Sequence, residues 1–155
     1  MHIFGLMLAT GVLSLSAIPG ANAASVSLMG DWLPTIGAPE LVGGAGTDFR
    51  FTIESSAYQA TLSVAYTGGA PWRLVVNRSG FSLPAGVTLA VRRNGSGSCG
   101  NLIGGLDYLT VSDQGQELFS GTGDCSGIGI QLRLEGVSIR QPPGFYETTV
   151  LYTVQ

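Results

Sequence analysis

Apolar residues recur at every second position in one segment after another, and this alternation constrains the fold more than any other feature. The cleanest example is a run in which Ile128, Ile130, Leu132 and Leu134 alternate with glycine and polar residues. A spacing of two places these side chains on one face of a β-strand. Beyond the apolar N-terminus, no ten-residue stretch shows the helical spacing of 3.6. The sequence therefore predicts an essentially all-β protein.

Other runs with the same alternation predict the remaining strands, at 26–32, 49–53, 62–66, 72–76, 87–91, 108–111, 118–120 and 146–154. Each is expected to turn one apolar face inward, as with Phe49, Phe51 and Ile53, or Leu62, Val64 and Tyr66. Turns rich in Gly and Pro separate most of the strands, which is typical of an antiparallel β-sandwich or a barrel.

Val137 and Ile139 have the opposite parity to the apolar residues of the strand before them. Gly136 lies between the two sets. A glycine inserted into a strand is a common place for a β-bulge, which can turn the same face inward again. The sequence therefore predicts a bulge at Gly136.

The only two cysteines, Cys99 and Cys125, flank the short strands 108–111 and 118–120, which we expect to form a hairpin. A disulfide between them would close the base of that hairpin and stabilise the fold by about 3 to 4 kcal/mol. A metal site is the alternative, but two thiolates without a histidine make a poor zinc site. We therefore predict a structural disulfide and no metal.

The N-terminus resembles a secretory signal peptide, with an apolar run that ends at Pro19 and a small-residue pattern, Ala21-Asn22-Ala23. An uncleaved membrane anchor is the alternative, although a spanning helix needs about 20 apolar residues. Cleavage after Ala23 would leave one domain, 24–155, in an oxidising compartment. We expect a secreted protein of the bacterial periplasm or cell surface without a later membrane span.

Composition excludes several classes of function. The chain has no lysine, and ten acidic residues exceed seven arginines, so nucleic-acid binding has no electrostatic support. The only histidine, His2, belongs to the predicted signal peptide, which removes His-based catalysis and most transition-metal sites. Gly95–Gly100 matches G-x-G-x-x-G, but glycines follow where the motif requires a helix. We therefore predict no cofactor.

Two further hypotheses depend on side chains whose positions the sequence does not fix. A glycosidase would need two facing carboxylates from Asp107, Asp113, Glu117 and Asp124, although acids in turns are usually only solvated. A carbohydrate-binding module would need exposed aromatic residues among Trp32, Trp72, Tyr58 and Tyr108, although aromatic residues on strands usually belong to the core.

The chain ends in Pro142-Pro143-Gly144-Phe145-Tyr146 followed by the alternating run to Val154. This ending resembles the last strand of secreted bacterial pilin subunits and spore-coat-U-type proteins. The resemblance implies an incomplete or rearranged immunoglobulin-like sandwich and a non-catalytic structural role at the cell surface or in an appendage, although pilin cysteines usually tie an early strand and Cys99 and Cys125 lie late. It also implies partners that are copies of the chain or other surface proteins.

In assembled pilins an N-terminal strand of one subunit completes the sheet of the next, and Val26, Leu28, Gly30 and Trp32 show the alternation of such a donor. These residues must pair with the sheet of their own chain or with that of a neighbour. We favour pairing within the chain, because the connector Pro34–Gly46 is long enough to fold the strand back.

Overall fold

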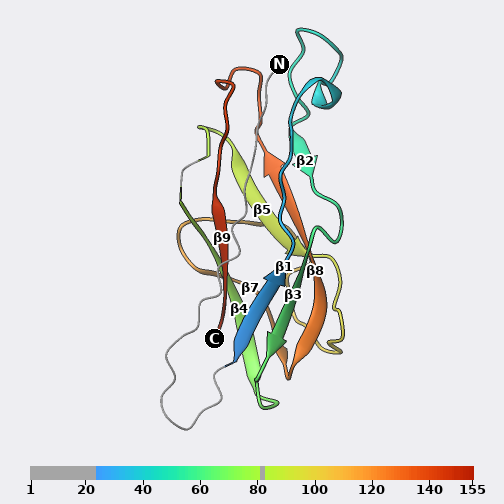
Figure 1. Ribbon diagram of the computed structural model, residues 1–155, viewed down its shortest axis with the longest axis vertical. Helices are drawn as coiled ribbons and strands as arrows, with labels where there is room; N and C mark the ends of the chain where they lie inside the picture. The colour runs from blue at the N-terminus through green and yellow to red at the C-terminus, as the bar shows by residue number, and fades with distance from the viewer. Residues whose placement is uncertain (1–23, 81–82) are drawn as a thin grey trace.

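Two antiparallel β-sheets face each other in the computed structural model of the chain, which describes residues 24–80 and 83–155 (Figure 1). The predicted signal peptide 1–23 lies outside the described residues. The elements are β1 (Ser25–Met29), the 3₁₀ turn η1 (Ala38–Glu40), β2 (Thr52–Glu54), β3 (Ala60–Ala65), β4 (Pro71–Ser79), β5 (Thr88–Arg93), β6 (Leu109–Thr110), β7 (Gln116–Thr122), β8 (Cys125–Glu135) and β9 (Thr149–Val154).

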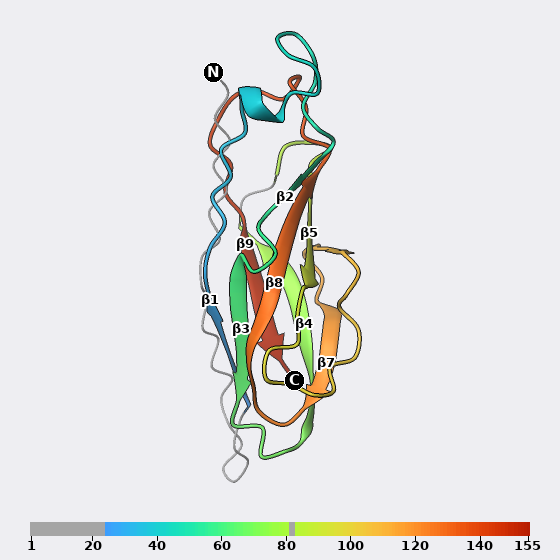
Figure 2. The same ribbon diagram turned by 90° about the vertical axis from the view of Figure 1, so that its right-hand side faces the viewer.

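The larger sheet has the order β1-β3-β8-β5-β6, and β2 pairs with β8 next to β3. The smaller sheet has the order β7-β4-β9. In Figure 2 the larger sheet faces the viewer with β4 and β9 behind it. The predicted all-β sandwich is therefore confirmed.

The core lies between the sheets, where the alternating side chains meet. Ile128, Ile130, Leu132 and Leu134 of β8 are all buried, as the spacing predicted. From the other sheet they meet residues such as Trp72, Leu74, Val76, Phe119, Val150 and Tyr152. Apolar area removed from water contributes about 25 cal/mol per Å², so this two-sided layer is the main source of stability.

Two of the predicted apolar faces are wrong at one residue each. Phe51 is 70% exposed, although Phe49 is buried, because β2 begins only at Thr52 and the chain before it is not a strand. Tyr66 is 69% exposed, because β3 ends at Ala65 and Tyr66 begins the turn to β4. The alternation of residue types thus extends one residue beyond each of these two strands.

The predicted hairpin at 108–120 is also wrong. The residues of β6 pair with β5 in the larger sheet, whereas β7 pairs with β4 in the smaller sheet. The connection 111–115 therefore crosses from one sheet to the other. Both strands were recognised, but neighbours in sequence need not pair, and only long-range packing decides which sheet a short strand joins.

Gly136 does not form a bulge within a strand. The strand β8 ends at Glu135, and Gly136 leaves it with φ +76°, a backbone region that favours glycine. A Cβ on Gly136 would lie 2.1 Å from the carbonyl oxygen of Gly86, so the backbones approach too closely for any side chain. Val137 is then buried, while Ile139 is 38% exposed.

Both terminal strands are shorter than predicted. The last strand begins at Thr149 instead of at Tyr146, whose hydroxyl donates a hydrogen bond to the carbonyl of Pro142 in the preceding loop. The first strand ends at Met29, and Gly30 follows with φ +111°.

None of the helices in the described ranges has the length and apolar character that membrane crossing requires.

Asp48 joins two loops at the end of the sandwich that carries η1. Its carboxylate accepts hydrogen bonds from the backbone N–H of Phe49 and Ile139 and from the hydroxyl of Ser138. The bond from the Ile139 N–H, followed by those from Phe49 and Ser138, lowers the pKa of Asp48 below its ordinary value. The ionised carboxylate therefore holds the 37–49 loop against the 136–142 loop.

We expect acid to weaken this junction. A carboxylate whose pKa is depressed in the folded protein contributes stability above the pKa of the unfolded chain and loses it as the pH falls through the folded value. That window lies below about pH 4. Urea unfolding at pH 5 and at pH 3 should show a smaller acid-induced loss for Asp48→Asn than for the wild type. Equal losses would show that Asp48 does not hold the loops together.

Candidate functional site: the open edge of strand β9

The last strand of the chain is hydrogen-bonded on one side only. Strand β9 pairs with β4 through the register Leu74↔Val154 to Ser79↔Thr149. Its other edge pairs with no strand among residues 24–80 and 83–155. A strand edge of this kind presents unpaired N–H and C=O groups to another chain.

The register identifies which backbone groups face outward. Gln155 and Arg73 exchange two backbone hydrogen bonds, of 2.9 and 3.0 Å. In an antiparallel ladder such pairs alternate with pairs that exchange none. Thr153, Leu151 and Thr149 therefore bond to β4, whereas the backbone N–H and C=O groups of Val154, Tyr152 and Val150 point to the open edge.

The same residues anchor the strand in the core. The side chains of Val150 and Tyr152 are only 2% and 5% exposed, although their backbone groups face outward. Burial raises the pKa of the Tyr152 hydroxyl, which keeps the side chain neutral at all physiological pH values. The edge is therefore a rigid template whose position the core fixes.

Strand β1 lies beside this edge but belongs to the other sheet. The two strands are in contact, and Figure 1 shows them running next to each other. Within the described residues β1 is paired only with β3, from Ser25↔Ala65 to Met29↔Thr61. This side of the sandwich thus has two neighbouring strand edges that are not hydrogen-bonded to each other.

The strand order shows what this side lacks. In the immunoglobulin arrangement, four strands ABED form one sheet, and the other sheet contains C, F and the last strand G, with F between C and G. The order β1-β3-β8-β5 corresponds to ABED, and β4 and β9 correspond to C and F. Position G, on the open edge of β9, is occupied by no strand of the described chain.

The opposite side of the sandwich is closed by the loop 94–106. Cys99 and Cys125 form the predicted disulfide, with Cα atoms 5.2 Å apart. It fastens this loop to the start of β8, and does not close a hairpin as expected. Ile103 of this loop exchanges two backbone hydrogen bonds, of 2.9 and 3.0 Å, with Ser120 of β7. The disulfide suggests an environment outside the cytoplasm.

A buried arginine also holds the loop. Arg93 is only 6% exposed, and its guanidinium donates to the carbonyl oxygens of Gly104 and Leu102 and to the hydroxyl of Ser96. These neutral acceptors solvate the buried charge locally. The contrast between a fastened side and an open side makes the β9 edge the candidate functional site.

The residues predicted as a strand donor lie next to this site. Val26 and Leu28 are on β1 and pair with Val64 and Leu62 of the same chain. Gly30 and Trp32 follow the strand, and the indole of Trp32 is buried. Within the described chain β1 therefore pairs with its own sheet, and Gly30 and Trp32 lie beyond it.

The four carboxylates considered for catalysis are all exposed and lie on different elements: Asp107 precedes β6, Asp113 precedes β7, Glu117 is on β7 and Asp124 precedes β8. Asp113 forms an ion pair with Arg78 at 3.2 Å. Asp124 accepts hydrogen bonds from Thr67, which lower its pKa. In the described part of the chain, acidic and cysteine side chains form no group of three suited to a metal ion.

The four aromatic residues considered for sugar binding do not form one exposed platform. Trp32 and Trp72 belong to the core. Tyr108 is half-buried, with the guanidinium groups of Arg92 and Arg133 at 4.5 and 3.9 Å from its ring centre. Only Tyr58 exposes most of its side chain, and it packs against the backbone of Gly129.

The resemblance implied an incomplete sandwich, but the pattern of residues did not locate the open edge. It recognised the terminal strand and predicted that it is paired and buried, which holds for its core face and for one of its two edges. The pairing partners of a strand depend on residues far away in the sequence, so alternation within 149–154 carries no signal for them.

No protein-family model matches this sequence, and neither does any curated protein.

Proposed function

We propose that this chain is a non-catalytic structural protein of the bacterial envelope, cell surface or a surface appendage, and that it assembles by β-strand addition at the open edge of β9. The observation that carries the proposal is the position beside β9 that no strand of the described residues, 24–80 and 83–155, occupies. The incoming strand comes from another copy or from another surface protein, as in the pilin subunits that the chain's ending resembles.

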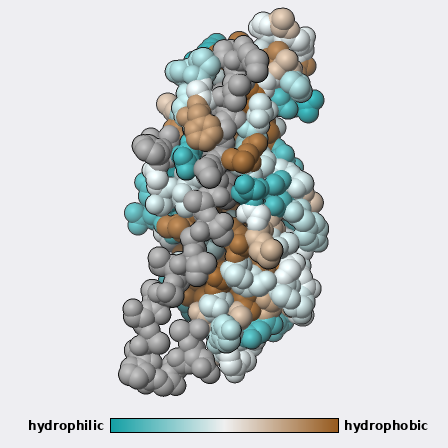
Figure 3. Space-filling model, in the orientation of Figure 1, coloured by the Kyte–Doolittle hydropathy of each residue, from teal (hydrophilic) through white to brown (hydrophobic). Residues whose placement is uncertain are grey.

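The chemistry of the edge supports an extended peptide as the partner. Outward N–H and C=O groups of Val150, Tyr152 and Val154 provide main-chain hydrogen bonds to any extended strand. Alternate side chains of that strand would enter the space between the two sheets, beside β1. Figure 3 shows separate hydrophobic patches on the face that carries β1 and β9. An alternating apolar strand therefore fits this position better than a polar one.

The signal-peptide pattern and the disulfide support the location. Export through a signal peptide would bring the chain to the oxidising periplasm, where Cys99 and Cys125 can be joined. The exposed and dispersed carboxylates, together with the absence of histidine from 24–155, support a role without catalysis.

A peptide of residues 24–33 in trans tests the proposal, because its alternation is that of a donor strand. We expect the folded protein to bind the fluorescently labelled peptide, measured by anisotropy. A peptide of the same composition with the alternation scrambled should not bind, because its apolar residues no longer share one face. Equal binding of both peptides, or of neither, would contradict β-strand addition.

Two proline variants one residue apart locate the binding edge. Proline removes a backbone N–H. At Val154 this group faces the open edge, so Val154→Pro should weaken peptide binding about tenfold or more with little loss of stability. At Thr153 the group bonds to Val75 of β4, so Thr153→Pro should lower the free energy of unfolding by about 1 to 3 kcal/mol. Urea unfolding and anisotropy measure the two effects.

The two proline variants also distinguish a peptide that joins β9 from a peptide that replaces β1 on β3. If the peptide replaced β1 on β3 instead of joining β9, Val154→Pro would bind it as tightly as the wild type. That result would contradict a functional edge at β9, and so would equal destabilisation by the two prolines.

A further inference from the structure

Asn94 lies where strand β5 gives way to the Gly-rich loop 94–106, and it is the only asparagine of the sequence that precedes a glycine. Its backbone N–H donates to the carbonyl oxygen of Gly129 at 2.8 Å. Its side-chain amide makes one hydrogen bond within the described residues, of 3.3 Å, to the carbonyl oxygen of Ala57. A single long contact therefore holds the side chain of Asn94.

The ring of Tyr58 explains why a glycine follows at position 95. The ring packs against Gly95 and Gly129, and a Cβ on Gly95 would come within 2.5 Å of the Tyr58 hydroxyl oxygen. Because Tyr58 is 59% exposed, the ring covers these two glycines from the solvent side and is not part of the core. Any larger residue at position 95 would displace the ring. The Asn-Gly pair is therefore a consequence of packing.

The backbone nitrogen of Gly95 is free to react. Its N–H donates no hydrogen bond to any residue that the structure describes, because β5 and its ladder end at Arg93. Glycine also has no Cβ that would keep this nitrogen away from the Asn94 side chain. Arg92 and Arg93 precede the site, and neither has an ion-pair partner among the described residues. Their positive charge favours the negative charge that develops when the nitrogen attacks.

We propose that Asn94 is a site of spontaneous deamidation in the folded protein. The Gly95 nitrogen gives its proton to water and attacks the side-chain amide carbon of Asn94, so that a new C–N bond forms. The bond from that carbon to the side-chain nitrogen breaks, and ammonia leaves with a proton taken from water. Water then opens the cyclic imide at either carbonyl, which yields aspartate or isoaspartate. Water is the only co-reactant that these steps need.

Either product changes the contact that holds Tyr58. A carboxylate only accepts hydrogen bonds, so it loses the bond that the Asn94 amide donates to the carbonyl of Ala57, one residue before Tyr58. Isoaspartate also adds an atom to the backbone before Gly95, which moves this glycine out from under the ring. The modification therefore loosens Tyr58 from Gly95 and Gly129.

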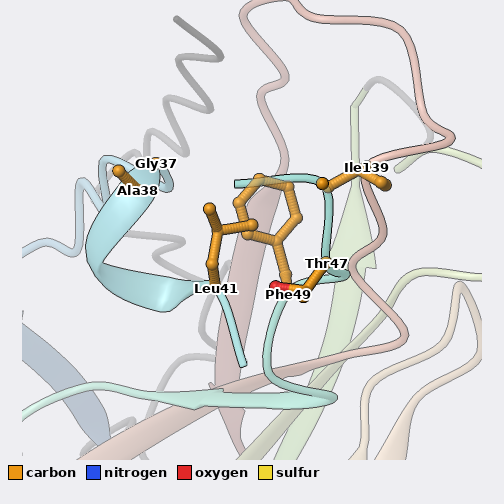
Figure 4. A pocket seen from close by; sticks show the side chains of 7 residues that line it. Gly37, Ala38, Leu41, Thr47, Phe49 and Ile139 are labelled. Carbon is orange, nitrogen blue, oxygen red and sulfur yellow. The ribbon is translucent and has the colours of Figure 1, made fainter. Parts of the chain in front are cut away.

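The other Gly-rich loop, 37–49, offers no such site. It contains no asparagine, and the side chain of Asp48 is an ionised carboxylate held by hydrogen bonds, which makes its carbon a poor electrophile. The next residue, Phe49, packs its ring beside Leu41 in the wall of an apolar hollow (Figure 4). A packed side chain fixes the backbone nitrogen that would have to move. The geometry therefore singles out Asn94.

Mass spectrometry of the aged protein tests the assignment. The protein is incubated at neutral and at mildly alkaline pH, reduced and cleaved after glutamate, so that one peptide, 55–117, contains Asn77, Asn94 and Asn101. We expect a gain of about 1 Da at Asn94, faster at the higher pH because the attack requires the deprotonated nitrogen. Asn77 and Asn101, which do not precede glycine, should keep their amides. Conversion of Asn94 no faster than that of the other two would overturn the proposal.

NMR of the Gly129 α-protons tests the consequence for Tyr58. The aromatic ring shifts these resonances in the fresh protein, and Tyr58→Ala gives their position without the ring. As the protein ages, the resonances should move toward those of Tyr58→Ala. In Asn94→Gln, whose longer side chain closes an imide far more slowly, they should not move with time. Resonances that stay in place while Asn94 is converted would contradict the loosening of Tyr58.

This site is separate from the open edge, because Asn94 follows a strand of the larger sheet and β9 belongs to the smaller one. The fully converted protein should bind the 24–33 peptide as the fresh protein does. If conversion also abolished peptide binding, the change would not be local to Tyr58, and the proposal would be wrong. Failure of the fresh protein to bind the peptide would count against strand addition alone.

Discussion

Replacing both Cys99 and Cys125 with alanine should lower the free energy of unfolding by about 3 to 4 kcal/mol. The disulfide closes a loop with a sequence separation of 26, and opening it returns conformational entropy to the unfolded chain. It also fastens the Gly-rich loop 94–106 to the start of β8. Urea unfolding of the double variant at neutral pH, against the oxidised wild type, measures the loss.

Reduced wild-type protein is the matched control, because it opens the same loop without changing any side chain beyond the thiols. It should unfold at nearly the same urea concentration as the double variant. If both lost less than about 1 kcal/mol, Arg93 and its acceptors in the loop would be sufficient to hold it, and the disulfide would have little structural role.

Trp72→Ala should destabilise the protein by about 3 to 5 kcal/mol, the range for truncating a buried tryptophan. The indole is 4% exposed, packs edge-on against Phe119 with ring centres 6.1 Å apart, and donates a hydrogen bond of 2.7 Å to the carbonyl of Gly123. Removing it leaves a cavity between the sheets and an unpaired carbonyl. Urea unfolding gives the loss directly.

Trp72→Phe separates the two contributions. The phenyl ring keeps most of the packing and loses the hydrogen bond and one ring of the indole, so the expected loss is about 1 to 3 kcal/mol. Tyr58→Ala, at an exposed aromatic residue, should cost less than either. If Trp72→Ala were no less stable than Tyr58→Ala, Trp72 would not belong to the core.

The strands themselves could be predicted because their signal is local. Alternating residues such as Ile128, Ile130 and Leu132 report which face is buried, and the prediction holds wherever a strand continues. It fails at Phe51, which precedes the start of β2, and at Tyr66, which follows the end of β3, because the alternation extends one residue beyond each strand. Local residue types do not record where the hydrogen-bonded ladder stops.

Sheet membership and edges could not be predicted, because they depend on distant partners. Leu109 and Phe119 lie on strands close in sequence but belong to different sheets. The open edge of β9 is likewise a property of its neighbours. It carries the proposed function, so the candidate functional site emerges only from the tertiary structure.

Amide hydrogen exchange along β9, followed by NMR in the free protein, tests the central claim most directly. The N–H groups of Thr149, Leu151 and Thr153 bond to β4 and should exchange slowly, whereas those of Val150, Tyr152 and Val154 face the open edge and should exchange rapidly. Adding the 24–33 peptide should protect the second set and leave the first unchanged. Uniform protection of all six residues before any peptide is added would show that the edge is already paired, and would contradict the account.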